Sequence, residues 1–224
     1  MPQISRTTRE DFFRSWPDWW PPREAFVSQH GVSEVQLSEF HQLVAERPSE
    51  RAIERFLAKN REVLSLALFL FSTGHHATWI YPKQQIRPAG KGINGLIPDY
   101  VMAGANSDGV SWWVLELKGP DKNAFKVRGR RVSLTSDANE GICQLLDYID
   151  VSSRSQAYLR DELKLAGYRE PRGALLIGTE EESEDEHVRD FKGAWNRMNP
   201  RVQIRSYTAL LREAERKIES QRRA

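Results

Sequence analysis

The stretch WWVLELKGP, residues 112–120, reads as an apolar strand that carries a glutamate and a lysine two positions apart. Side chains alternate between the two faces of a strand, so Glu116 and Lys118 share a face with Val114, whereas Leu115 points to the other side. Most of the stretch consists of residue types found in protein interiors. The sequence therefore predicts a buried strand with two opposite charges on one face.

This strand is expected to form the second arm of a β-hairpin. The runs LIPDYVMA, residues 96–103, and VSWWVLELK, residues 110–118, are both rich in β-forming residues. The loop between them contains Asp108-Gly109, a dipeptide that favours tight hairpin turns. The pattern is typical of two neighbouring antiparallel strands.

Two registers are open for this hairpin, and both bring Asp99 to the face of Glu116 and Lys118. A two-residue turn places Asp99 opposite Lys118, and a four-residue loop, 106–109, places it opposite Glu116. Directly opposed Cβ atoms lie about 5 Å apart and diagonal ones about 7–8 Å apart. In either register the carboxylates of Asp99 and Glu116 can share one cation.

The charges allow two interpretations. On a protein surface, Asp99 and Lys118 would form a cross-strand ion pair worth about 0–1 kcal/mol. In an interior each ion is costly to desolvate, which favours a functional role. Carboxylate oxygens suit Mg²⁺, with Mn²⁺ as an alternative. Such a metal ion would polarise a phosphodiester and help to ionise water, while Lys118 stabilises charge on the phosphoryl oxygens.

Helices precede, interrupt and follow the strands, which predicts an α/β fold with a mixed β-sheet flanked by helices. The expected strands are 77–86, 96–103, 110–118, 173–179 and 202–207. The expected helices begin at Ser33 and Ser49 and continue at 61–72, 141–150, 158–165, 180–195 and 208–221. A Gly-rich loop is expected at 87–95, and 119–139 is a basic stretch without clear periodicity.

Composition limits the class of protein. The chain has 224 residues, a formal net charge of +2 and a single cysteine, Cys143, which excludes an internal disulfide. The longest apolar run, 64–71, is far shorter than the roughly 20 residues that a membrane span requires. We therefore expect a cytoplasmic protein that does not enter a membrane.

Pro98-Asp99, followed after the hairpin by Glu116-Leu117-Lys118, resembles the PD-(D/E)xK signature of a large nuclease superfamily. Three further features match this pattern. They are a glutamate on a preceding helix, a hairpin of the right length, and a following helix with a glutamine and a tyrosine spaced as in a QxxxY element.

In wording and order, five segments resemble the nuclease domain of the Shedu family of bacterial anti-phage defence proteins. The segments are SERAIERFLAKNREVL, IPDYVMAG, WWVLELKGP, GICQLLDYID and GALLIGT. The resemblance covers about residues 48–215 and implies a restriction-endonuclease-like PD-(D/E)xK core. It also implies a DNA endonuclease or nickase that assembles as a homo-oligomer. We accordingly divide the chain into an N-terminal appendage, 1–47, and a nuclease domain, 48–224.

The resemblance also implies roles for individual residues. The implied metal ligands are Asp99, Glu116 and the main-chain carbonyl of Leu117. The implied catalytic residues are Glu50, Asp99, Glu116, Lys118 and Gln144. For the helix glutamate, Glu54 is the alternative to Glu50. At about 100° per residue, Glu50 lies roughly 70° and Glu54 roughly 110° from the centre of the apolar stripe of their helix, so Glu50 is expected nearer the core.

Other residues are candidates for contacts with DNA. Gln144 and Tyr148 lie one turn apart, off the apolar face of their helix, and are either substrate contacts or ordinary helix surface. The Trp-rich stretch 16–22 can stack on bases or pack in a subunit interface, and we favour packing. A basic group after the motif is either a phosphate-backbone contact or a solvated loop. Its members are Lys122, Lys126, Arg128, Arg130 and Arg131.

Two other functions stay open at this point. One is a catalytically silent DNA-binding or sensor module with the same fold, in which the site serves only as a scaffold. The other is a restriction or repair nuclease of the same superfamily. The intact trio of Asp99, Glu116 and Lys118 favours an enzyme.

Overall fold

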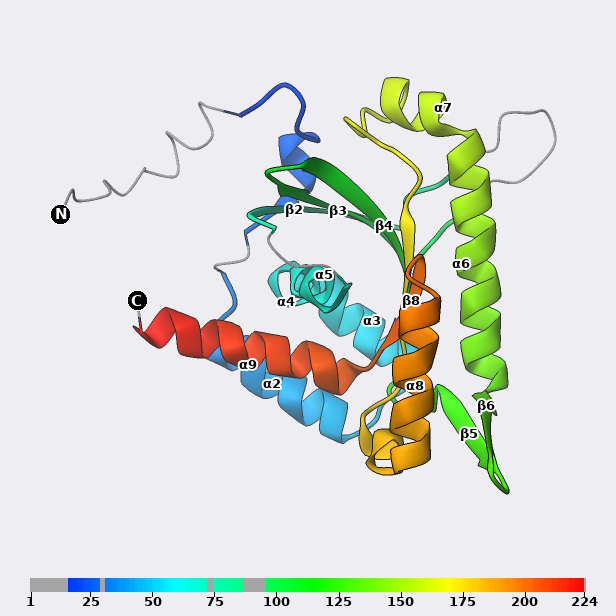
Figure 1. Cartoon of the computed structure of the whole chain (residues 1–224). Helices are drawn as coiled ribbons and strands as arrows, with labels where there is room; N and C mark the ends of the chain where they lie inside the picture. Colours follow the sequence, from blue (N-terminus) through cyan, green and yellow to red (C-terminus); the bar gives the residue numbers. More distant parts are fainter. Residues whose placement is uncertain (1–15, 29–30, 72–74, 87–95, 224) are drawn as a thin grey trace.

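A computed structural model describes residues 16–28, 31–71, 75–86 and 96–223, so the expected Gly-rich loop 87–95 lies outside the described residues. At its centre is a six-stranded sheet with the order β1-β2-β3-β4-β7-β8 (Figure 1). Strands β1 to β4 pair antiparallel, whereas β4, β7 and β8 run parallel. The strands are β1 (Phe26–Val27), β2 (Ala77–Pro82), β3 (Tyr100–Asn106), β4 (Gly109–Leu117), β7 (Arg172–Leu176) and β8 (Val202–Arg205). The predicted mixed sheet is confirmed.

Helices flank both faces of this sheet, as predicted (Figure 1). One group consists of α2 (Glu34–Ala45), α3 (Glu50–Lys59), α4 (Arg61–Ser65), α5 (Ala67–Phe71) and α9 (Tyr207–Arg223). The other consists of α6 (Ser136–Arg154), α7 (Gln156–Asp161) and α8 (Glu186–Met198). Two short 3₁₀ helices are η1 (Arg23–Ala25) and η2 (Glu181–Glu184). A separate hairpin of β5 (Phe125–Arg128) and β6 (Arg131–Leu134) leads into α6.

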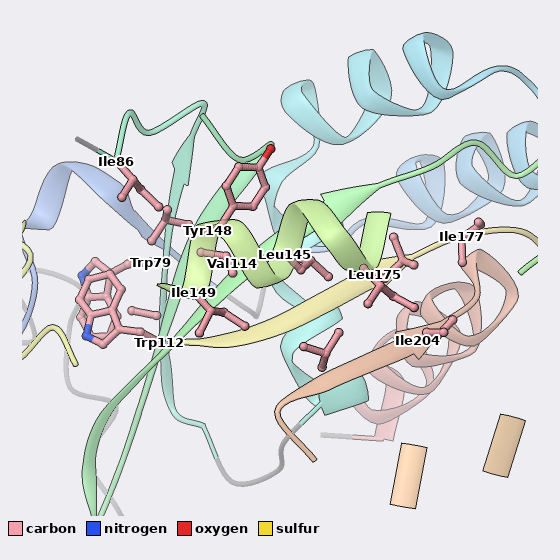
Figure 2. Close-up of a cluster of buried hydrophobic side chains, with 14 of the residues drawn as sticks. Trp79, Ile86, Trp112, Val114, Leu145, Tyr148, Ile149, Leu175, Ile177 and Ile204 are labelled. Atoms are coloured by element: carbon pink, nitrogen blue, oxygen red, sulfur yellow. The ribbon is translucent and has the colours of Figure 1, made fainter. Parts of the chain in front are cut away.

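Two apolar cores fill the space between sheet and helices, and β4 contributes to both through its alternating side chains. Val114 lies in the core that contains Leu145 of α6 (Figure 2). Leu115 points the other way, into the core that contains Leu57 of α3. Glu116 is on the same side of β4 as Val114. The sheet therefore directs Glu116 toward α6.

The hairpin register is now fixed. Ala105 pairs with Val110 and Tyr100 with Leu115, which continues to Asp99 opposite Glu116. This is the pairing of the longer-loop alternative. The ladder extends further than expected, however, so the turn consists of residues 107 and 108.

Neither alternative gave the turn itself correctly, since Asn106 pairs with Gly109 and the turn is neither Asp108-Gly109 nor the four-residue loop 106–109. The side-chain oxygen of Asn106 accepts a hydrogen bond from the Asp108 N–H over 2.9 Å, which closes the turn locally. Gly109 is already the first residue of β4, and its φ of +112° suits a residue without a Cβ.

Several element boundaries differ from the sequence expectation. The helix expected at 61–72 is two short helices that meet at Leu66. The strand expected at 77–86 ends at Pro82, and Ile86 makes only an isolated bridge to Leu96. The helix expected from 141 starts at Ser136, because the side chain of Thr135 caps it by accepting the Ala138 N–H.

The Trp-rich segment packs within the chain. Trp16 and Trp20 make edge-to-face contacts with Trp79 of β2, at centroid distances of 5.9 and 5.1 Å. Trp16 also meets Phe26 of β1 at 5.4 Å. The two rings thus cover the face of β1 and β2 on which Phe26 and Trp79 are paired. Among the described residues, no helix is both long enough and apolar enough to cross a membrane.

Candidate active site

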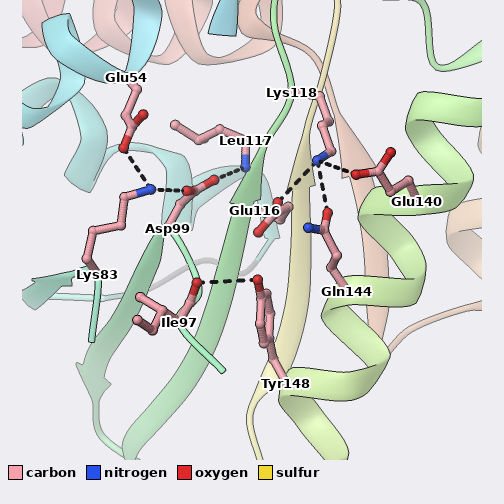
Figure 3. A network of polar contacts seen from close by, with 10 residues as sticks. All are labelled: Glu54, Lys83, Ile97, Asp99, Glu116, Leu117, Lys118, Glu140, Gln144 and Tyr148. Atoms are coloured by element: carbon pink, nitrogen blue, oxygen red, sulfur yellow. Dashed lines mark hydrogen bonds and ion pairs between the residues drawn. The ribbon is translucent and has the colours of Figure 1, made fainter. Parts of the chain in front are cut away.

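Asp99 and Glu116 lie side by side where β4 ends, and both are buried, with 9% and 5% of their surface exposed (Figure 3). The Leu117 N–H donates a hydrogen bond of 2.8 Å to Oδ2 of Asp99. The Lys83 ammonium donates one of 2.5 Å to Oδ1 of the same carboxylate. Asp99 is therefore held from both sides, and its position relative to β4 is fixed by the strand itself.

Lys83 is a residue of the site that the sequence interpretation missed. It follows β2 with a φ of +47°, and its N–H donates to the Asp99 carbonyl over 2.8 Å. Its ammonium also pairs with Oε1 of Glu54 over 2.8 Å. Burial alone would lower the pKa of Lys83, but its bonds to Asp99 and Glu54 outweigh burial and raise it. The side chain is thus a fixed positive charge next to Asp99.

Lys118 binds Glu116, the second carboxylate of the pair, as Lys83 binds Asp99. Its ammonium donates to Oε1 of Glu116 over 3.3 Å and to Oε1 of Gln144 over 2.9 Å. Glu140 is 3.7 Å away. Burial, together with the neighbouring Asp99, raises the pKa of Glu116 to about 7 even though Lys118 opposes the shift. The carboxylate pair is therefore a place where added positive charge would be stabilising.

Helix α6 supplies three side chains at successive turns, Glu140, Gln144 and Tyr148 (Figure 3). Gln144 contacts Lys118, as the sequence suggested for a residue of the site. Tyr148 is 7% exposed, and its hydroxyl donates to the carbonyl of Ile97 over 3.3 Å. The expectation that Tyr148 lies off the apolar face of its helix is therefore wrong, because its ring is part of the buried core and anchors the chain just before Asp99.

The two glutamates of α3 have different surroundings. Glu50 is the first residue of the helix and is exposed, whereas Glu54 is half-buried and paired with Lys83. The expectation that Glu50 lies nearer the core is wrong, because Glu50 is at the exposed start of the helix and Glu54 is one turn further in. Although the residue as a whole is exposed, the protein around its carboxyl group desolvates it enough to raise the pKa of Glu50; Lys118 opposes this shift and Asp99 adds to it, so Glu50 interacts electrostatically with the site.

The close contact between the start of α3 and the end of β4 depends on Gly119. A Cβ on Gly119 would lie 2.9 Å from the main-chain nitrogen of Glu50, a distance that real Cβ atoms do not show. A glycine directly after Lys118 therefore lets the start of α3 approach the end of β4.

The basic candidates divide into two groups. Lys122 lies 3.8 Å from both Asp121 and Asp137, next to the start of α6. The others are on the β5–β6 hairpin and are exposed: Lys126, Arg128, Arg130 and Arg131.

The donor set fits a divalent cation of the magnesium type. Mg²⁺ needs only one or two protein carboxylates, and Asp99 and Glu116 provide two, one of them bound by the Leu117 N–H. The part of the chain that the structure describes contains no group of three or more His, Cys, Asp or Glu placed to bind a metal ion. A divalent cation would therefore be held chiefly by Asp99 and Glu116, whose neighbouring negative charges repel each other in its absence.

The side chains that surround the carboxylate pair differ in their exposure to solvent. The side chains of Lys83 and Glu140 are 52% and 68% exposed, whereas that of Lys118 is 11% exposed. A separate hollow of about 790 Å³ lies between α2, α8 and α9 and includes neither carboxylate.

The fold and site define a mixed α/β protein with a buried carboxylate pair and a lysine at the end of a central strand. The chain belongs to the Shedu family, since residues 47–211 match the family model described as Shedu protein SduA, C-terminal. This confirms the resemblance seen in the sequence. No curated protein matches the chain.

Proposed function

We propose that the chain is a metal-dependent DNA endonuclease or nickase of bacterial anti-phage defence, built on a PD-(D/E)xK core. The observation that carries this proposal is the convergence of Asp99, Glu116 and Lys118 at the end of β4. Membership of the Shedu family supports the defence role. We further propose that the protein acts as a homo-oligomer in the cytoplasm.

The chemistry follows from the positions of the side chains. Mg²⁺ or Mn²⁺ bound to Asp99 and Glu116 would supply Lewis acidity for a phosphodiester and for the attacking water. Lys118 stays protonated, because its interactions with Glu116 outweigh the effect of burial and raise its pKa. Its ammonium can therefore neutralise charge that develops on the phosphoryl oxygens.

Neighbouring residues hold these groups in place. Gln144 accepts a hydrogen bond from Lys118 and so fixes the direction of the ammonium. The Leu117 N–H fixes the Asp99 carboxylate in the same way. Preorganisation of this kind contributes to catalysis because little is left to rearrange when charge develops.

Nicking of a supercoiled plasmid tests the proposal. With Mg²⁺ the wild type should nick, and Lys118→Ala should lower the rate by about 10²–10³-fold, the usual cost of removing one charge-stabilising donor. Lys59→Ala is the matched control, since Lys59 is an exposed lysine at the far end of α3. Wild-type protein that binds the plasmid but leaves it intact with Mg²⁺ or Mn²⁺ would instead support a silent DNA-binding module.

A further inference from the structure

The β5–β6 hairpin separates its charged and apolar residues onto opposite faces. Its strands pair Phe125 with Leu134, Lys126 with Ser133, Val127 with Val132 and Arg128 with Arg131. Directly paired residues share a face, and successive residues alternate between faces. One face is therefore entirely apolar. The other consists of three cations and a serine.

The apolar face anchors the hairpin to the body of the protein. Phe125 is 2% exposed, and its ring meets that of Phe191 on α8 edge to face at 5.6 Å. Val132 and Leu134 are partly buried against the same core. Val127, nearer the turn, is 45% exposed, so the apolar face is packed inward at Phe125, Val132 and Leu134, and the opposite face is turned away from the protein there.

The outward face is a concentrated positive surface. Lys126, Arg128 and Arg131 are exposed on it, and Arg130 is exposed in the turn beside them. None of the ion pairs found among the described residues involves these four cations. The whole chain has a net charge of only +2, so this hairpin is a strong local departure from the average.

The hairpin is also close to the candidate active site. β6 leads directly into α6 through Thr135, and α6 carries Gln144, which contacts Lys118. At about 1.5 Å per helical residue, Gln144 lies about 13 Å along α6 from Thr135. At about 3.3 Å per strand residue, Arg131 lies about 13 Å from Thr135 along β6. The two points are thus separated by less than one turn of B-DNA, about 34 Å.

We propose that the cationic face of the β5–β6 hairpin binds the backbone of duplex DNA while the adjacent site acts on the same duplex. This inference rests on the proposed nuclease function and names the form of its substrate. A two-stranded ribbon is of a size that the major groove admits, and arginine and lysine side chains contact phosphates without reading sequence. Single-strand binding generally adds aromatic stacking surfaces, and this face has none.

Binding without added metal, measured by fluorescence anisotropy over a series of salt concentrations, tests the proposal. The probes are a 30-bp duplex and one of its single strands. The test variant carries Lys126→Gln, Arg128→Gln and Arg131→Gln. It should bind the duplex at least tenfold more weakly at about 0.1 M salt, and the slope of log K against log[salt] should fall by about 2–3. Single-strand binding should change much less.

The matched control removes the same charge elsewhere, through Arg216→Gln, Arg222→Gln and Arg223→Gln on α9. It should bind the duplex like the wild type, and thermal melting should show that both variants remain folded. A duplex affinity and salt slope that the hairpin variant leaves unchanged would overturn the proposal, as would equal losses for duplex and single strand. Duplex binding that needs the hairpin, in a wild type that never nicks, would support the hairpin's role and contradict the nuclease function.

Discussion

The ammonium of Lys83 already occupies the carboxylate of Asp99 on which the proposed metal site depends. Its bond to Oδ1 is 2.5 Å long, and its second partner is Glu54. A divalent cation at Asp99 would meet this positive charge within a few ångströms, which disfavours metal binding. Lys83 therefore offsets the negative charge of Asp99 in the metal-free site and would at the same time limit the affinity of the site for a divalent cation.

Replacement of Lys83 by methionine tests this competition. Lys83→Met should lower the melting temperature of the metal-free protein, because Asp99 loses a partner, and should increase the rise in melting temperature that Mg²⁺ produces. Thermal melting with EDTA and with a series of Mg²⁺ concentrations measures both effects. Lys59→Met should change neither. A Mg²⁺-induced rise that is equal to or smaller than that of the wild type would argue against competition.

For individual residues, the sequence is sufficient to predict those positions that a single hairpin determines. Strand alternation alone brought Asp99 to the face of Glu116 and Lys118. Lys83 could not be foreseen, because its place beside Asp99 depends on the pairing of β2 with β3 across a long connection. Local sequence does not specify such a register, which is set by the packing of the whole sheet.

Among the elements, α6 carries the residues that reach Lys118, and a glycine allows it to lie close to β7. A Cβ on Gly141 would come within 2.7 Å of Cδ1 of Leu175 and within 3.5 Å of Cε of Lys118. Leu175 is fully buried and cannot easily move aside. The close approach of helix and strand thus helps to place Gln144.

Two glycine-to-alanine changes separate packing from helix propensity. Gly141→Ala should lower the free energy of unfolding by about 1 kcal/mol and reduce nicking, because overpacking outweighs the gain in helix propensity. Gly193→Ala in α8 meets only the end of the Arg197 side chain at 3.1 Å and should raise stability by about 0.5–1 kcal/mol. Urea denaturation measures both. If both variants proved more stable than the wild type, the tight α6–β7 contact would be wrong.

The β5–β6 hairpin shows why some elements escape prediction. Its alternation of Phe125 and Val127 with Lys126 and Arg128 is only four residues long, and the basic residues suggest a solvated loop. The period becomes clear only when the paired strand β6 is considered with it. The start of α6 was missed for a similar reason, since a single capping threonine precedes a polar first turn.

For the whole molecule, the order of helices and strands was sufficient to predict a mixed sheet with helices on both faces. The sheet changes from antiparallel to parallel pairing at β4, and the charged residues lie at the end of that strand. Side chains from both layers of helices meet there, Glu54 from α3 and Gln144 from α6. The fold therefore determines where the candidate site lies, because it brings both layers of helices to the end of β4.

Calorimetric titration of Mn²⁺ into the metal-free protein tests most directly whether Asp99 and Glu116 hold a divalent cation. The wild type should show saturable binding with one site per chain, weakened at least tenfold in both Asp99→Asn and Glu116→Gln, because each removes a charged oxygen ligand. Affinity that both substitutions leave unchanged, or a wild type that shows no saturable binding, would contradict a metal site at the end of β4.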